Sequence, residues 1–129
     1  MTRYTDEELE RGRAVMAQVY GFTVEADAPQ AELPYIQETL GKLFADVWTR
    51  EELSIRERRL ITIGIAASQG QSSLLRLQFE AARANGELTQ AQIDEIIVHI
   101  AYYAGWPNAT AALDAAYGLK VAEPPTVSP

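Results

Sequence analysis

The sequence predicts an all-α protein of about six helices, and three observations lead to that prediction. At Thr5, Ser54 and Thr89 a hydroxyl residue is followed three positions later by Glu or Gln, which is the capping-box pattern of a helix start. Glycines follow several of the expected helices, where they favour the left-handed turn that ends a helix. Apolar residues recur at helical spacing, and no convincing strand or βαβ pattern is present.

The first helix is expected to run from the cap at Thr5 to about Tyr20, with Gly21 as its stop. Its apolar stripe is only partial, which indicates a peripheral helix or one that packs on another subunit. After a loop, a second helix enters at Pro34 and closes at Trp48. Its expected core residues share helical spacing: Ile36, Leu40, Leu43, Phe44 and Val47.

The third helix begins at the Ser54 cap. The run from Leu60 to Ala67 is almost entirely apolar, and it predicts a helix buried on nearly all sides. Because glycine destabilises a helix interior by about 1 kcal/mol relative to alanine, we interpret Gly64 as a point of close helix approach. A fourth helix is expected between a cap at Ser72 or Ser73 and a stop at Asn85-Gly86, with Leu74, Leu77, Ala81 and Ala82 facing the core.

The fifth helix starts at the Thr89 cap and ends at Gly105. Its apolar stripe is regular and comprises Ile93, Ile96, Ile97, Ile100, Ala101 and Ala104. A sixth, alanine-rich helix begins at Pro107 and ends at Gly118. Residues 1–118 are therefore expected to form one domain, followed by a flexible, proline-rich tail over residues 119–129.

Composition excludes several classes of function. A net charge of −7 disfavours non-specific nucleic-acid binding, and the absence of cysteine excludes disulfides and thiolate chemistry. No apolar run is long enough to span a bilayer, so no membrane association is expected. The N-terminus lacks the apolar core of a signal peptide, which predicts a cytoplasmic protein. No metal-ligand cluster or nucleotide-binding motif is present, and we expect no cofactor.

Basic residues are concentrated near the start of the third helix. Arg50, Arg56, Arg58 and Arg59 supply four of the eleven lysines and arginines. This cluster is either a solvated helix start with surface ion pairs or a site for a small anionic ligand.

His99 is the only histidine, and its unperturbed pKa lies near neutrality. Glu95 lies one helical turn earlier, where its carboxylate could orient the imidazole. Tyr103 lies one turn later on the same side. A structural hydrogen-bonding role and a catalytic role are both open for His99.

Three further side chains carry alternative readings. Glu57 is either a general base or only the capping partner of Ser54. Gln78 falls on the apolar side of its helix, where it either braces the core or binds a ligand. Trp48 is either core packing or a ligand wall.

Four motifs in the same order resemble the carboxymuconolactone decarboxylase family, which is related to the alkylhydroperoxidase AhpD. They read W-T-R, then L-S-I-R-E-R-R-L-I-T-I, then L-R-L-Q-F-E-A-A-R-A-N-G, and finally E-I-I-V-H-I-A-Y-Y-A-G-W-P-N-A. The resemblance covers about residues 39–116. It implies an AhpD-like helical bundle that assembles as a homotrimer or homohexamer.

The chain departs from both branches of this family. The cysteine pair of the peroxidase branch falls on Gln69 and Ser72, with Arg76 at its histidine position, so a thiol peroxidase is excluded. The decarboxylase branch, which this chain resembles more, typically reads L-x-L-H where this chain has Leu75-Arg76-Leu77-Gln78. Glutamine can hydrogen-bond a substrate, but it cannot transfer a proton near neutral pH.

The resemblance implies cofactor-independent decarboxylation, or a related proton transfer or isomerisation, on a small carboxylated lactone or enolisable acid. Arg58 would hold a substrate carboxylate, Gln78 would bind the oxyanion or the ring, and His99 would transfer the proton with Glu95 or Glu57 orienting it. Trp48, Tyr103 and Trp106 would line the pocket. The alternative is a non-catalytic member of the family that uses the helical scaffold for binding or assembly.

Overall fold

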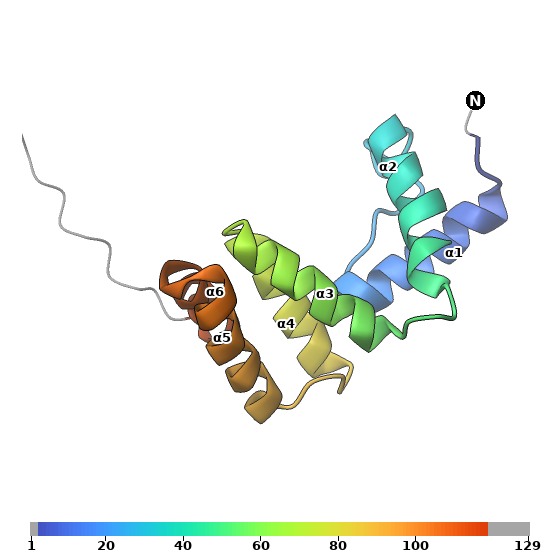
Figure 1. The fold of residues 1–129 in the computed structure, drawn as a ribbon. Coiled ribbons are helices and arrows are strands. Elements are labelled where there is room, and N and C mark those ends of the chain that lie inside the picture. The colour runs from blue at the N-terminus through green and yellow to red at the C-terminus, as the bar shows by residue number, and fades with distance from the viewer. Residues whose placement is uncertain (1–2, 119–129) are drawn as a thin grey trace, which may run out of the picture.

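The computed structural model describes residues 3–118, and these form helices without a strand (Figure 1). The all-α prediction is therefore confirmed for this part of the chain. The longest connection, residues 21–33, joins the first two helices. The helices are α1 (Asp6–Tyr20), α2 (Pro34–Glu38), α3 (Ile55–Ser68), α4 (Ser72–Ala84), α5 (Gln90–Ala104) and α6 (Trp106–Tyr117). Between α2 and α3 lie a π-helical segment η1 (Thr39–Phe44) and a 3-10 turn η2 (Val47–Thr49). The predicted tail over residues 119–129 lies outside the described residues.

The three predicted capping boxes are present. At α3, Ser54 Oγ accepts the N–H of Glu57 at 3.0 Å, and Glu57 Oε1 accepts the N–H of Ser54 at 2.8 Å. Thr5 and Thr89 make the same reciprocal bonds at the starts of α1 and α5. The predicted serine cap of α4 is wrong. Its N-cap is Gln71, and no side chain caps it, because Ser72 and Ser73 already lie within the helix.

The predicted second helix is not continuous. After α2 the backbone widens into η1, where the N–H of Ala45 bonds the carbonyl of Leu40, five residues earlier, at 3.0 Å. The widened segment lies where α1 comes closest, since a Cβ on Gly12 would lie 1.9 Å from the Leu40 oxygen. Leu40 and Phe44 are fully buried by this packing, whereas the predicted core residue Leu43 is 38% exposed.

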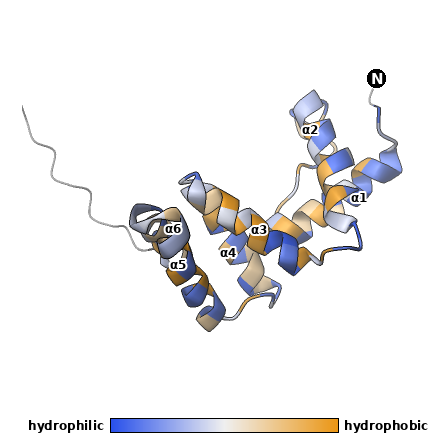
Figure 2. Cartoon of the chain, viewed as in Figure 1, coloured by the Kyte–Doolittle hydropathy of each residue, from blue (hydrophilic) through white to orange (hydrophobic). Residues whose placement is uncertain are grey.

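The described residues form two apolar cores, and Figure 2 shows the apolar segments of the helices that supply them. One core joins α3, α4, α5 and α6, and its larger members are Ile63, Leu75, Phe79, Leu88, Ile93 and Ile100. The other joins α1 to η1 and η2 through residues such as Val19, Leu40, Phe44 and Trp48. Figure 1 shows α1 and α2 at one end of the molecule, α5 and α6 at the other, and α3 and α4 between them.

A buried arginine links the two cores. Arg59 of α3 is fully buried, and its Nη1 donates to the carbonyl of Val19 in α1 at 2.7 Å and to Gln78 Oε1 in α4 at 2.8 Å. Its Nε and Nη2 donate to the two carboxylate oxygens of Glu87 at 2.6 and 3.0 Å. The charge of Arg59 is thus neutralised inside the protein.

The prediction that α3 is buried on nearly all sides is wrong for the single chain. Ile61 is 52% exposed and Ile65 is 54% exposed, because no helix of the described chain covers that face. Gly64 is not a point of close approach either, since a Cβ at this position would meet no atom within 4 Å. The space beside Gly64 belongs to a groove between α3 and α5.

Candidate functional site

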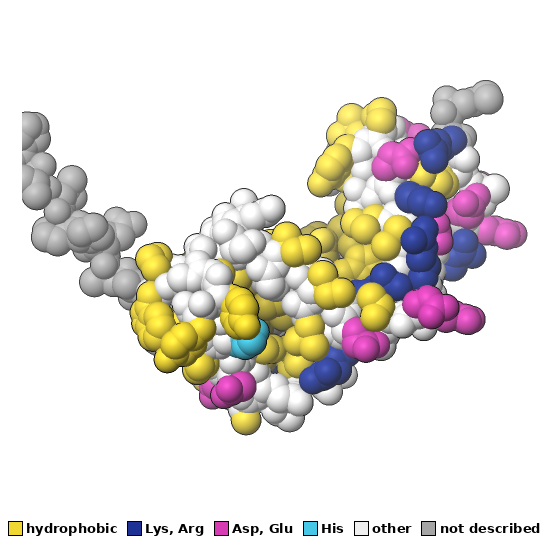
Figure 3. Space-filling model, viewed as in Figure 1, with side chains coloured by type: hydrophobic (Ala, Val, Ile, Leu, Met, Phe, Trp, Pro, Cys, Tyr) yellow, Lys and Arg dark blue, Asp and Glu magenta, His cyan; other side chains and the backbone are white. Residues whose placement is uncertain are grey.

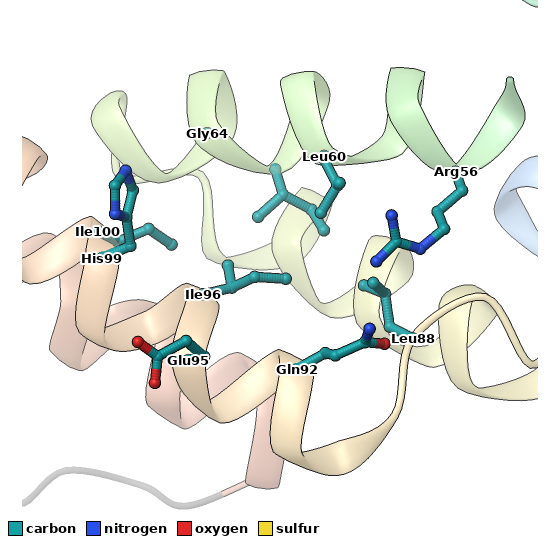
Figure 4. A pocket seen from close by; sticks show the side chains of 10 residues that line it. Arg56, Leu60, Gly64, Leu88, Gln92, Glu95, Ile96, His99 and Ile100 are labelled. Carbon is teal, nitrogen blue, oxygen red and sulfur yellow. The ribbon is translucent and has the colours of Figure 1, made fainter. Parts of the chain in front are cut away.

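A groove of about 430 Å³ separates α3 from α5 (Figure 4). Helix α3 lines it with Arg56, Leu60, Ile63 and Gly64, and α5 lines it with Gln92, Glu95, Ile96, His99 and Ile100, while Leu88 from the preceding turn completes it. Most of these side chains are apolar. A volume of this size falls in the range of small-molecule sites.

Three polar side chains of the groove lie toward its two ends, and a fourth, Glu95, lies on α5 between Gln92 and His99. In Figure 4, Arg56 and Gln92 stand at one end and His99 stands at the other, with Leu60 and Ile96 between them. Eight residues of helix separate Arg56 from Gly64, which corresponds to about 12 Å at about 1.5 Å per residue. The groove can therefore hold a small organic molecule between the guanidinium of Arg56 at one end and the imidazole of His99 at the other.

His99 is exposed, and its ring stacks on that of Tyr103 with centroids 4.7 Å apart. Glu95, one turn earlier, lines the same groove and is also exposed, but no hydrogen bond joins it to His99 in the described part of the chain. Figure 3 shows the histidine at the surface among hydrophobic side chains. His99 is thus accessible to a ligand, as a catalytic role requires.

Arg58, the predicted carboxylate clamp, does not line the groove. Its Nη2 donates to the carbonyl of Arg50 at 3.2 Å, and its Nε is buried without a partner in residues 3–118. The arginine that does line the groove is Arg56, whose Nε donates to the carbonyl of Glu87 at 3.0 Å. Helical spacing could have identified Arg56, because positions 56, 60, 63 and 64 share one face of α3.

Gln78 also lies outside the groove lining. It is fully buried and accepts the hydrogen bond from Arg59, while its Nε2 has no partner among the described residues. Of the two readings that the sequence allowed, the observed contacts are those of a core brace. The Arg58, Gln78 and His99 side chains therefore do not converge on this groove.

Glu57 is exposed, and its Oε1 accepts the N–H of Ser54 in the capping box of α3. The hydrogen bonds from the backbone and hydroxyl of Ser54, followed by the charges of Arg56 and Arg58, hold the pKa of this carboxyl below its usual value. A lowered pKa makes Glu57 a weak base, which fits a capping role better than general-base catalysis.

The three predicted aromatic wall residues lie in different places. Trp48 is buried in the core shared by α1 and η1, where its ring stacks near that of Phe44 at 6.3 Å. Trp106 is 62% exposed at the start of α6 and packs edge-to-face on Tyr102. Tyr103 is 83% exposed beside His99. None of the three lines the groove.

Residues 3–118 contain neither a metal-binding cluster nor a membrane-spanning helix. No group of three or more His, Asp or Glu side chains is arranged there to hold a metal ion. No helix in that range is long and apolar enough to cross a membrane.

Comparison with known proteins supports the family resemblance. Residues 34–117 match the carboxymuconolactone decarboxylase family, and this stretch contains every residue that lines the groove. A 4-carboxymuconolactone decarboxylase of Acinetobacter baylyi is 34% identical to the chain over 70 residues, which is 54% of this chain and 52% of that protein. The matched stretch thus spans about half the length of this curated relative. The chain belongs to the carboxymuconolactone decarboxylase family.

Proposed function

We propose that this protein catalyses cofactor-independent decarboxylation, or a related proton transfer, on a small carboxylated lactone or enolisable acid. One observation carries the proposal: the α3–α5 groove has an arginine at one end, an accessible histidine at the other and apolar side chains between them. Family membership and the similarity to a 4-carboxymuconolactone decarboxylase point to the same reaction class.

Loss of carbon dioxide from such a lactone needs no cofactor. The bond to the leaving carboxylate breaks, and its electron pair moves through the unsaturated ring to the carbonyl oxygen. The resulting oxyanion then returns the electron pair to a ring carbon, which takes up one proton. The protein must hold an anionic substrate, stabilise the oxyanion and supply that proton.

His99 is the groove residue suited to supply the proton. Imidazole is the side chain that enzymes use most often for proton transfer, and the exposure of His99 leaves its ring open to water and to a ligand. The carboxylate of Glu95 lines the same groove, one helical turn before His99. Arg58 and Gln78 do not line this groove, so Arg56 takes the place of Arg58 in the proposal.

Incubation with γ-carboxymuconolactone and related lactone acids tests the proposal, with substrate loss followed by absorbance and product by mass spectrometry. We expect turnover by the natural protein. Replacement His99→Gln should lower kcat by about 100-fold, since a positioned proton donor contributes roughly 10²–10⁴-fold. The exposed Tyr102→Phe variant is the matched control and should keep kcat within about two-fold. No turnover across the panel would contradict the proposed function.

We also propose that the protein self-associates through its exposed apolar side chains. Ile61 and Ile65 of α3 are each more than half exposed, as are Tyr102, Tyr103 and Trp106 at the α5–α6 junction. Exposed apolar patches of this kind mark interfaces. Light scattering should give a mass above that of the 14.3 kDa chain, and the double variant Ile61→Glu, Ile65→Glu should give a smaller assembly. A natural protein that is monomeric at micromolar concentration would contradict this proposal.

A further inference from the structure

The guanidinium of Arg56 is held at one end of the groove by the backbone of the α4–α5 turn. Its Nε donates to the carbonyl of Glu87 at 3.0 Å, which fixes the plane of the group. Its two terminal nitrogens make no hydrogen bond to another of the residues 3–118. Figure 4 shows the guanidinium extending into the groove on the side of Leu88 and Gln92, with one terminal nitrogen directed toward Leu88. Arg56 thus presents a donor fork of the geometry that binds a carboxylate.

The amide of Gln92 faces the same end of the groove, and the cap of α5 fixes which of its atoms is free. Gln92 Oε1 accepts the N–H of Thr89 at 2.9 Å, so the acceptor side of the amide is occupied. The Nε2 group, a donor of two hydrogens, remains on the other side. The capping box therefore orients a second hydrogen-bond donor beside Arg56.

The turn between α4 and α5 supplies the Glu87 carbonyl that holds Arg56 and the Thr89 N–H that holds Gln92. Hydrogen bonds and packing fix this turn in place. The Glu87 carboxylate accepts hydrogen bonds from Nε and Nη2 of the buried Arg59. Glu87 Oε2 also accepts a hydrogen bond from Asn85 Nδ2 at 2.9 Å. The side chain of Leu88 packs into the core of α3 to α6 and also lines the groove. The donors are thus positioned before any ligand arrives, which lowers the entropy lost on binding.

We infer that Arg56 and Gln92 form a carboxylate-binding subsite, and that the ligand is an acid whose apolar body lies along Leu60 and Ile96. The guanidinium would bind the carboxylate through its terminal nitrogens, and the Gln92 Nε2 group would donate a further hydrogen bond. The rest of the ligand would extend toward His99. This inference deepens the proposed function, because it places the anionic end of the substrate, but the subsite can be tested without turnover.

Phenylacetate and its neutral counterpart phenylacetamide provide the test, with affinities measured by calorimetry. The two probes have the same shape, so their ratio reports recognition of the negative charge. We expect the natural protein to bind phenylacetate more tightly. Arg56→Gln should weaken phenylacetate binding about ten-fold or more, since it removes the charge-assisted hydrogen bonds to the carboxylate, and should leave phenylacetamide binding within about two-fold.

The substitution Gln92→Glu tests the role of the Nε2 donor in ligand binding without removing the helix cap at Thr89. A glutamate at this position still accepts the Thr89 N–H, so the folded protein should keep its thermal stability. Its second oxygen replaces the Nε2 donor by a negative charge, and phenylacetate affinity should fall about ten-fold or more. Ala91→Glu adds the same charge in the same turn but outside the groove lining, and it should change the affinity by less than about two-fold.

Two results would overturn the subsite. One is phenylacetate binding no tighter than phenylacetamide in the natural protein. The other is an unchanged ratio of the two affinities in Arg56→Gln or Gln92→Glu, including equal weakening of both probes. These results are distinct from failure of the proposed function. Carboxylate recognition without turnover of any lactone acid would support the subsite and contradict the enzyme. Turnover with an unchanged KM in Arg56→Gln would support the enzyme and overturn the subsite.

Discussion

Gly12 and Gly64 both lie inside helices, yet the structure gives them opposite surroundings. A Cβ on Gly12 would lie 1.9 Å from the backbone oxygen of Leu40, whereas a Cβ on Gly64 would meet nothing within 4 Å. We expect Gly12→Ala to destabilise the protein by about 3 kcal/mol or more, because backbone cannot move aside as a flexible side chain can. Gly64→Ala should raise the free energy of unfolding by about 0.5–1 kcal/mol.

Urea unfolding of the two variants measures this difference. A stabilised Gly12→Ala protein would contradict the close crossing of α1 and η1. A strongly destabilised Gly64→Ala protein would mean that another chain covers the groove beside α3 in solution. Gly12→Ala thus tests a close backbone contact, and Gly64→Ala tests an open space beside α3.

Sequence patterns could not predict the different surroundings of these two glycines, or those of the arginines at positions 56, 58 and 59. The glycine at position 64 interrupts an apolar run, so a close approach was the natural prediction, but contact depends on which helix lies opposite. Arg56, Arg58 and Arg59 follow one another within a single turn, and a rotation of 100° per residue sends them to different places. One lines the groove, one bonds the carbonyl of Arg50, and one is buried among three elements.

At the scale of the element, helix starts are set by local chemistry. Ser54 and Glu57 exchange two hydrogen bonds at the start of α3, whereas no side chain caps α4. We expect Ser54→Ala to lower the free energy of unfolding by about 1 kcal/mol. Ser73→Ala should leave it unchanged or slightly raised, since Ser73 already lies inside α4 and alanine is the better helix former. Equal effects of the two substitutions in urea unfolding would contradict this assignment.

Local signals explain why the helix boundaries were predictable. The boxes at Thr5, Ser54 and Thr89 lie entirely within four residues each, and the glycines at 21 and 118 adopt left-handed conformations after the last turn. The widened segment η1 was not predictable, because it accompanies a contact between residues 12 and 40. The groove was likewise only partly predictable. His99 could be identified from the sequence, but the position of α3 opposite α5 could not, because it depends on long-range packing.

At the scale of the whole molecule, the buried ion pair between Arg59 and Glu87 connects the two cores. The Arg59 side chain has no exposed surface, and that of Glu87 is 12% exposed. Removal of one partner leaves a buried charge without compensation. We expect Glu87→Gln to lower the free energy of unfolding at pH 7 by about 2–3 kcal/mol, while the exposed Glu80→Gln changes it by less than about 0.5 kcal/mol.

The same pair predicts how stability depends on pH. Burial alone would raise the pKa of Glu87, but the hydrogen bonds from Arg59 and Asn85 and the charge of Arg59 outweigh it and hold the pKa below the usual 4.5. The unfolded chain therefore takes up this proton more readily than the folded protein does. The contribution of Glu87 to stability is complete above the unfolded pKa and is lost as the pH falls through the lower, folded value.

Urea unfolding at a series of pH values between 7 and 3 tests this dependence. The natural protein should lose more stability on acidification than Glu87→Gln, because the variant has no carboxyl to protonate at this position. Glu80→Gln should follow the natural protein. Parallel curves for the natural protein and Glu87→Gln would show that the ion pair does not control acid stability. Convergence of the two curves at low pH is the expected result, since protonation of Glu87 leaves Arg59 as uncompensated as the substitution does.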